Sequence, residues 1–281
     1  MNTNRSSYAL GAALGTALVL ALCAPASAAD IYNYDGGLKG GYDVPPPPPS
    51  DRGIYFKGYI GQANPDVGNL WTDAFATNSS FQVHHKAIKS SPLYGIGVGW
   101  QARHWLRFDL TGEYRGDAAF YGHDTYQTFG PGANEYTANV ESWLGLANAY
   151  IDMGNWCGFT PYIGAGIGFA SISVNGLRDD GINSAGGPAS PSMAFGGDKT
   201  TTNFAWAIHA GVSYDVTPQM AIDLSYRYTD LGSARSGAIT TYDGAQTIQS
   251  GLHIKDITSN DLLFGVRYKL QRETVAYSPV K

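Results

Sequence analysis

The chain has 281 residues, of which 36 are glycine, 19 tyrosine and 6 tryptophan, and only 15% are charged. A soluble domain is usually about a quarter charged, so this composition is atypical of one. Apolar residues still make up 43%, which excludes disorder throughout the chain. The mean hydropathy of −0.19 excludes a bundle of membrane helices. The net charge of −5, with no basic tract in the sequence, excludes nucleic acid as a partner.

Residues 1–28 have the features of a secretory signal peptide. Arg5 is the only charged residue of this segment, an apolar run follows it, and Ala26-Ser27-Ala28 closes it. A basic start, a short apolar core and a small-x-small exit are typical of export signals that are removed, here between Ala28 and Ala29. The alternative is a retained membrane anchor, which the small residues at the exit disfavour.

Residues 29–52 form a spacer rich in proline and glycine. The unbroken run Pro45 to Pro49 cannot join the interior of a sheet and favours an extended polyproline II helix. Cleavage of the signal also removes Cys23, which leaves Cys157 as the one cysteine. No intramolecular disulfide is therefore expected in the exported protein.

Residues 53–270 alternate apolar and polar side chains, which indicates β-strands rather than an amphipathic helix. In residues 105–115 one face is apolar, while the other carries Arg107, Asp109, Glu113 and Arg115. Seven other segments repeat this period of two. Residues 140–151 do so least clearly, because Trp143, Leu144 and Leu146 place apolar side chains on both faces. Eight strands are expected in all: residues 54–60, 94–100, 105–115, 140–151, 162–169, 204–215, 221–229 and 261–270.

The connections between these strands alternate strictly in length. Three are short turns, at residues 101–104, 154–158 and 216–219. Four are long, at residues 62–91, 116–138, 173–202 and 232–256. A transmembrane barrel has short periplasmic turns and long extracellular loops, whereas a soluble sandwich has no reason to separate them. The sequence therefore predicts an all-β fold, an eight-stranded antiparallel up-and-down transmembrane β-barrel, with a polar carboxy-terminal tail at residues 271–281.

Glycine and aromatic residues fit this barrel. Gly95, Gly97 and Gly99 lie on the lumen face of their strand, where they leave room for larger side chains opposite. Aromatic residues beside the short turns are typical of an interfacial girdle: Trp100, Trp105, Trp156 and Tyr214.

The polar faces of the strands predict a charge network in the lumen. It would contain Lys57, Arg107, Asp109, Glu113, Arg115, Asp223, Arg227, Asp261 and Arg267, with Lys269 and Asp215 as further inward candidates. Unpaired charges in a narrow lumen are costly. One interpretation is a plug of ion pairs that stabilises a closed barrel; the other is a narrow polar conduit. Eight-stranded barrels are filled by their own side chains, which favours the plug.

No arrangement of residues indicates catalysis, a cofactor or a metal. A lipid-modifying barrel would need serine, histidine and an acid together at the membrane face. The histidines are instead scattered over the predicted loops, one turn and the lumen: His84, His85, His123, His253, His104 and His209. Tyrosines of the predicted loops are candidates for surface contact, the alternative being solvated loops with no fixed partner: Tyr121, Tyr126, Tyr136 and Tyr242.

Three stretches resemble a known family: residues 143–170, 204–232 and 262–268. They are similar to the porin-like surface antigens of α-proteobacteria, the Opa-like group of small outer-membrane β-barrels. The resemblance implies location in the outer membrane, no shared active site, and outer-membrane lipid, lipopolysaccharide and the barrel assembly machinery as partners. Such barrels usually end on an aromatic residue that the machinery reads, for which Tyr268 is in range here.

The resemblance also implies a role for the amino end. Related barrels are attached to the cell wall there, so Ala29 and Asp30 form a possible link to peptidoglycan; the alternative is a passive linker. The function expected is an outer-membrane structural, porin-like barrel that supports envelope integrity and displays surface loops. The second interpretation is a narrow channel for small polar solutes, and the third is a lipid-modifying enzyme. The sequence indicates no particular partner for the surface loops.

Overall fold

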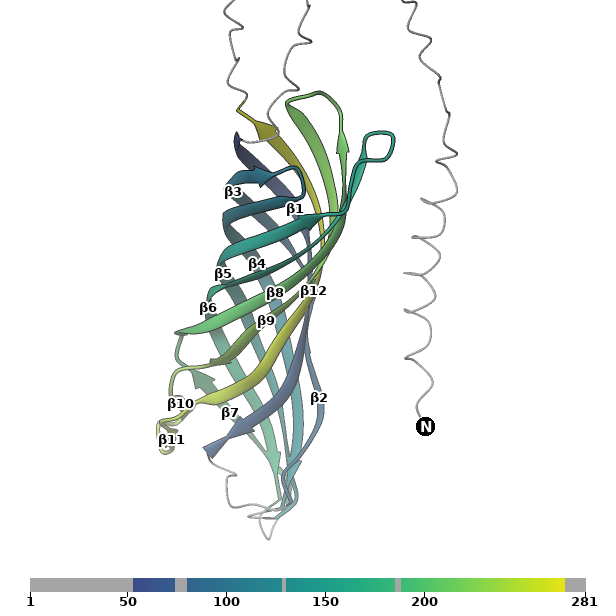
Figure 1. Ribbon diagram of the computed structural model, residues 1–281. Coiled ribbons are helices and arrows are strands. Elements are labelled where there is room, and N and C mark those ends of the chain that lie inside the picture. Colours follow the sequence, from purple (N-terminus) through teal and green to yellow (C-terminus); the bar gives the residue numbers. More distant parts are fainter. Residues whose placement is uncertain (1–52, 74–79, 128–129, 185–187, 271–281) are drawn as a thin grey trace, which may run out of the picture.

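The computed structural model describes residues 53–73, 80–127, 130–184 and 188–270. They form one antiparallel sheet of twelve strands, in which β12 pairs with β1 and closes a ring of eight strands (Figure 1). Among the described residues, no helix is long and apolar enough to cross a membrane. The ring follows the order β1 (Gly53–Thr72), β3 (Ser91–Arg103), β4 (Leu106–Tyr126), β5 (Gly132–Asp152), β6 (Phe159–Asn183), β8 (Lys199–Asp215), β9 (Met220–Arg235) and β12 (Leu252–Lys269).

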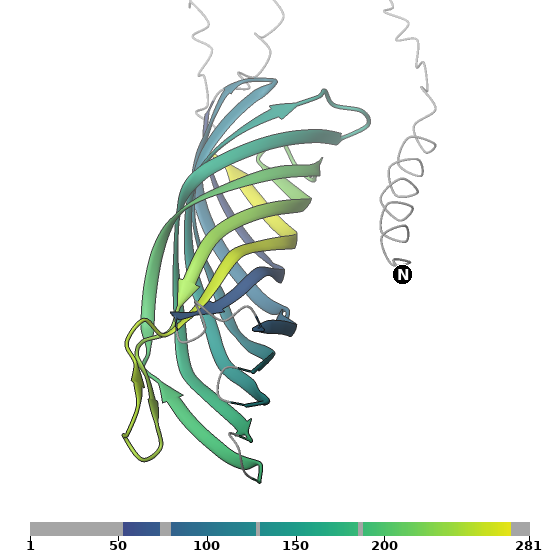
Figure 2. The same cartoon turned by 90° about the horizontal axis from the view of Figure 1, so that it is seen from below.

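The predicted fold class is confirmed, but the extent of the long loops is wrong. The strands continue far into the segments read as loops, and β4 still pairs with β5 at Tyr126 and Gly132. Four more strands lie in these segments: β2 (Gln82–Ile88), β7 (Ser190–Gly196), β10 (Ile239–Thr241) and β11 (Thr247–Ile248). All four lie at the end of the barrel opposite the short turns, which is the extracellular end of a transmembrane barrel (Figures 1 and 2).

A band of apolar side chains surrounds the half of the barrel next to the short turns. No charged residue points outward within this band on β4, where Phe108, Leu110 and Gly112 alternate with buried charges. Such a belt with aromatic rings at its margins is the surface that a bilayer-spanning barrel presents to lipid. Exposed aromatic residues near the short turns are Trp100, Phe108, Tyr214 and Tyr268, and those at the other margin are Tyr94, Trp143, Phe169 and Phe204.

Beyond this band the polarity of the barrel is reversed: apolar side chains face the interior and polar side chains face outward. On β4 the register shifts between Arg115 and Ala118, so the odd-numbered residues that face the lumen give way to even-numbered ones, beginning with Ala118 and Phe120. The alternation in the sequence keeps its phase, but the bulge moves its apolar residues from the lipid side to the interior. The strand thereby leaves the bilayer with a polar exterior.

Four other strands also switch faces. The buried positions change parity at residues 68–69 in β1, at Gly176 in β6, at Gly232 in β9 and at Asp256 in β12. Gly176, Gly232 and Asp256 have positive φ. At the β9 switch the amide of Asn203 donates to the carbonyl oxygens of Leu231 and Ser233 at 3.1 and 2.6 Å. These hydrogen bonds satisfy carbonyls that the irregular backbone frees from the ladder.

The interior of the extracellular half is a packed apolar core. It explains Leu144 and Leu146, which break the predicted alternation of β5: both point inward and are about 2–3% exposed. The core joins side chains from strands around the ring, including Val67, Leu70, Phe120, Ile172, Leu177, Ile254 and Ile257. Burial of this apolar surface stabilises the β-structure outside the membrane.

Glycines on the lumen face make room for rings, as predicted. A methyl group at Gly99 would overlap the ring of Tyr55, and one at Gly164 would overlap the ring of Tyr150. Both rings are buried. The glycine excess of the sequence is therefore matched to large lumen side chains on neighbouring strands.

Replacing Gly99 with alanine tests this packing. The Tyr55 ring cannot move aside freely, because it is fully buried and its hydroxyl donates to Asp109 at 3.2 Å. Overpacking of this kind costs about 1–3 kcal/mol. We expect Gly99→Ala to convert from the folded to the unfolded gel band at a lower temperature than the wild type. Gly112→Ala is the control, because a methyl group there meets no atom within 4 Å; equal losses in both variants would contradict the packing argument.

Candidate functional site

Two arginines and two carboxylates form the centre of the lumen. Arg227 contacts Glu113 at 2.7 Å and Asp261 at 2.8 Å, and Arg115 contacts the same two carboxylates at 2.9 and 2.7 Å. Every side chain of this quartet is at most 4% exposed. The four residues come from β4, β9 and β12. Because the charges alternate and each carboxylate contacts two cations, the quartet is electrically balanced across the barrel.

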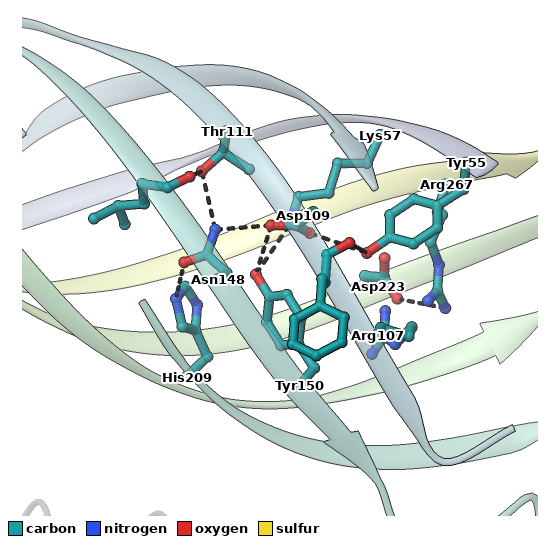
Figure 3. Close-up of polar contacts among 12 residues, drawn as sticks. Tyr55, Lys57, Arg107, Asp109, Thr111, Asn148, Tyr150, His209, Asp223 and Arg267 are labelled. Carbon is teal, nitrogen blue, oxygen red and sulfur yellow. Dashed lines mark hydrogen bonds and ion pairs between the residues drawn. The ribbon is translucent and has the colours of Figure 1, made fainter. Parts of the chain in front are cut away.

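A second cluster lies toward the short turns (Figure 3). Asp109 accepts hydrogen bonds from Lys57 at 2.8 Å, from Asn148 at 2.7 Å and from Tyr55 at 3.2 Å. The Arg267 side chain lies 3.4 Å from Asp223 and donates to Ser213 at 3.0 Å. The carboxylates here receive hydrogen bonds from both charged and neutral donors, which is what buried charge requires.

Asp152 completes the network, although the predicted set of lumen charges does not include it. Arg107 donates to its Oδ1 through Nε and Nη2 at 3.0 and 2.7 Å. Its even number could have indicated this role, because the even-numbered residues of β5 face inward, and Asp152 shares that face with Asn148 and Tyr150. The structure brings together all nine residues of the predicted network. It leaves Lys269 and Asp215 outside, since Asp215 instead accepts from Asn155 at 3.0 Å.

His209 lies in the lumen and contacts neutral groups. Its Nε2 is 3.2 Å from Oδ1 of Asn148, and its ring packs edge-on against Tyr150 with centroids 5.3 Å apart. Among the described residues, no group of three histidine, cysteine, aspartate or glutamate side chains is placed to hold a metal ion. His84 and His123 approach each other on β2 and β4, with ring centroids 5.6 Å apart.

The charged side chains fill the lumen at the level of the apolar band. Among the described residues, two cavities of about 30 Å³ each lie in this packing. One lies beside Lys57 and His209, and the other lies above Arg115 against Ile172. A cavity of this size holds about two water molecules. The lumen at this level is therefore packed with side chains, apart from such water-sized spaces.

The extracellular tyrosines divide into two groups, which corrects their prediction as loop residues. Tyr121 and Tyr242 are exposed, the latter by 81%, but Tyr126 and Tyr136 are buried inside the extended barrel. Likewise residues 175–183, read as a polar loop, are the last part of β6. Strand extension, with its reversal of faces, carries these side chains inward.

Several predictions fall outside the described residues. They are the signal cleavage between Ala28 and Ala29, the wall link at Ala29 and Asp30, the spacer up to residue 52 and the tail from residue 271. Cys157 is described: it is a free, exposed cysteine in the turn between β5 and β6.

Comparison with known proteins places this geometry among outer-membrane barrels. The family model described as the outer membrane protein beta-barrel domain matches residues 14–269. An uncharacterized protein of Brucella abortus strain 2308 is 27% identical, over 92% of this chain and 99% of its own length. The outer membrane protein PagN of Salmonella typhimurium is 30% identical, over 58% of this chain and 64% of its own length. The crystal structure of OprG from Pseudomonas aeruginosa superimposes with a TM-score of 0.49 at 12% identity, over 79% of this chain and 98% of that one.

Arg227→Met tests how much the quartet contributes to stability. The substitution leaves Glu113 and Asp261 to share Arg115, and breaking a buried pair in this way costs about 3–5 kcal/mol. We expect that loss in the free energy of unfolding, measured by urea titration of the refolded protein in detergent micelles. Arg178→Met is the control, because Arg178 and Asp180 form a surface pair with side chains 49% and 43% exposed. Surface pairs contribute about 1 kcal/mol at most, so a similar loss in both variants would contradict a stabilising quartet.

Proposed function

Because the chain belongs to the outer-membrane β-barrel domain family, we propose that it is a closed structural barrel that supports the integrity of the outer membrane. It also holds a folded β-sheet above the membrane surface. Its partners in this role are outer-membrane lipid and lipopolysaccharide around the apolar band, and the barrel assembly machinery during insertion. Tyr268, exposed on the last strand, is the aromatic residue available to that machinery.

The observation that carries this proposal is the filled lumen. Each of five lumen cations contacts a carboxylate, and the five carboxylates concerned are Asp109, Glu113, Asp152, Asp223 and Asp261. A solute would have to break several of these buried contacts to pass. Above them the apolar core adds a second barrier to polar solutes. A structural role requires no passage through the lumen, so the filled interior supports this role.

The second function is a narrow channel for small polar solutes. The water-sized cavities beside Lys57 and Arg115 favour it only if the ion pairs rearrange. The third, a lipid-modifying enzyme, has no support in the described geometry, and a mass change of lipid A on expression would be its test.

Attachment to the cell wall is a separate part of the proposal. It is supported by the sequence of residues 29–52, whose length allows a reach of at most about 80 Å from the barrel. The link would form at the amino group of Ala29 after signal removal. A passive linker is the alternative.

Electrical recordings test the closed barrel. We expect the refolded protein in planar bilayers to show no stable open state, since each charged side chain of the lumen network contacts a side chain of opposite charge. A sixteen-stranded porin in the same bilayers is the positive control, because barrels of that size leave an aqueous channel. A stable conducting state of the wild-type protein would overturn the closed barrel and support the channel.

Mass spectrometry of cell-wall digests tests the attachment. We expect a muropeptide joined to the amino group of Ala29 in digests of cells that express the protein. A variant in which residues 29–52 are deleted, with the signal and barrel retained, serves as the control. Digests in which every recovered amino-terminal peptide carries a free Ala29 would contradict the attachment and leave the closed barrel unaffected.

A further inference from the structure

The extracellular end of the barrel contains a cavity that the structural role does not use. Its volume is about 390 Å³, which lies within the range of small-molecule sites. Its walls come from the end of β1 at Thr72, from β4 to β7, and from β10 and β11. Because the lumen below is filled, this cavity is a cup that opens away from the membrane. We call it the vestibule.

Polar atoms in the vestibule wall lack partners. Among the described residues, Oγ1 of Thr72, Oδ1 of Asp179 and Oδ1 of Asn183 are buried and make no hydrogen bond. Thr72 is only 2% exposed. All three atoms can accept hydrogen bonds; the amide oxygen of Asn183 and the ionised carboxylate of Asp179 can only accept. Leaving buried polar groups unpaired is costly, so the wall is short of hydrogen-bond donors.

A side-chain amide of the wall is already engaged. Asn134 donates through Nδ2 to Oδ1 of Asp124 at 3.2 Å and to the hydroxyl of Tyr136 at 3.1 Å. Asp124, behind this amide, is completely buried, and its Oδ2 has no partner among the described residues. Asn183 similarly donates to the hydroxyl of Tyr126 at 3.3 Å. The remaining acceptors, on Thr72, Asp179 and Asn183, therefore have no donor within the described wall.

The wall is also short of positive charge. No lysine or arginine is among the described residues that line the vestibule. Burial raises the pKa of Asp179 to about 7, and repulsion from Asp124 and Asp180 acts in the same direction. Burial likewise raises the pKa of Asp124 to about 6, although Tyr136 and Asn134 and the nearby His123 and His84 lower it. Arg178, the neighbouring cation, is paired with Asp180 on the exposed side.

The rest of the vestibule is apolar and aromatic. Ile239 and Ile248 line one side, and the rings of Tyr126 and Tyr136 line another. Aromatic rings attract cations, and aliphatic side chains accept a short hydrocarbon chain. The vestibule wall thus contains an uncompensated acid and further unpaired acceptors, together with apolar and aromatic surface.

We propose that the vestibule binds a small alkylammonium group. The ammonium donates a hydrogen bond to the unpaired oxygen of Asp179, while its carbon chain lies against Ile239 and Ile248. An ammonium carries donors and one positive charge, which match the unpaired oxygen and the uncompensated charge of this carboxylate. An anion would meet acceptors and negative charge, and a neutral alcohol would supply one donor without the charge.

Three ligands of one chain length separate charge from hydrogen bonding. Butylammonium carries both, butyltrimethylammonium carries the charge without donors, and 1-butanol carries a donor without the charge. We expect butylammonium to shift the side-chain amide signals of Asn183 and Asn134 in nitrogen–proton NMR spectra of the full protein in zwitterionic nanodiscs at pH 8. The two analogues should bind at least about tenfold more weakly, since hydrogen bonds to charged groups are worth roughly a factor of ten or more. Equal binding of all three ligands, or no shift with butylammonium, would overturn the proposal.

Substitutions at neighbouring positions locate the site. Asp179→Asn keeps the shape but removes the charge and should weaken butylammonium binding about tenfold or more. Asp180→Asn, next to it but paired outward with Arg178, should change the affinity by less than about twofold. Ile248→Ser is a second test, at the apolar wall, should Asp179→Asn not fold. Unchanged affinity in both Asp179→Asn and Ile248→Ser would overturn the site.

The pH dependence gives an independent reading. Butylammonium stays protonated from pH 5 to 8, while Asp179 gains its charge as the pH rises through about 7. Affinity should therefore rise over this range in the wild type and stay flat in Asp179→Asn. A flat profile in the wild type would contradict a carboxylate-dependent site.

Capped lysine, Nα-acetyl-lysine methylamide, distinguishes two sources of the ligand. Its binding would assign the site to lysine side chains of a surface partner, and its failure to bind where butylammonium binds would assign the site to free amines.

Discussion

The pairing of β1 with β12 is the constraint on which the rest of the molecule depends. It joins the first and last strands over a register from Tyr55 and Lys269 to Thr72 and Leu252. In a bilayer no water is present to satisfy an open sheet edge, so a sheet can cross only when it closes. Closure after eight strands also fixes the lumen at a width that side chains fill. The lumen glycines and the buried charged side chains both follow from the need to fill that narrow space.

The same space is filled in two chemically different ways. Within the bilayer the lipid side takes the apolar residues, so the interior receives the polar ones, and Arg227 with Glu113 and Asp261 becomes its centre. Above the bilayer the exterior meets water, so the apolar residues move inside. A regular strand cannot make this exchange without a change of phase. The bulge after Arg115 and the positive-φ residues Gly176 and Gly232 provide it.

Much of this architecture could be predicted from the sequence, because the alternation of apolar and polar residues and the lengths of the connections both follow from a closed ring of strands. Alternation placed Arg107 and Asp109 on one face and gave the number of strands, and the unequal connections indicated the barrel. The extracellular half was misread for a physical reason: the bulge after Arg115 turns the apolar residues inward, so the segment beyond it lacks a lipid-facing apolar side although it continues β4. The vestibule could not be predicted either, because Thr72 and Asp179 are distant in sequence and line one cavity only when β1 closes the ring.

The two interiors also differ in how they respond to solution conditions. In the lumen each carboxylate has a cation beside it, so its charge is compensated within the fold. In the vestibule Asp179 has a raised pKa and no cation, so the folded state holds a proton more tightly than the unfolded chain does. Stability from this group is present at low pH and falls as the pH rises toward and through about 7. An ammonium bound at Asp179, as proposed for the vestibule, would oppose that loss, because a ligand that binds the folded state stabilises it. The charges of the lumen thus balance one another within the fold, whereas no cation among the described residues of the vestibule wall balances the charge of Asp179.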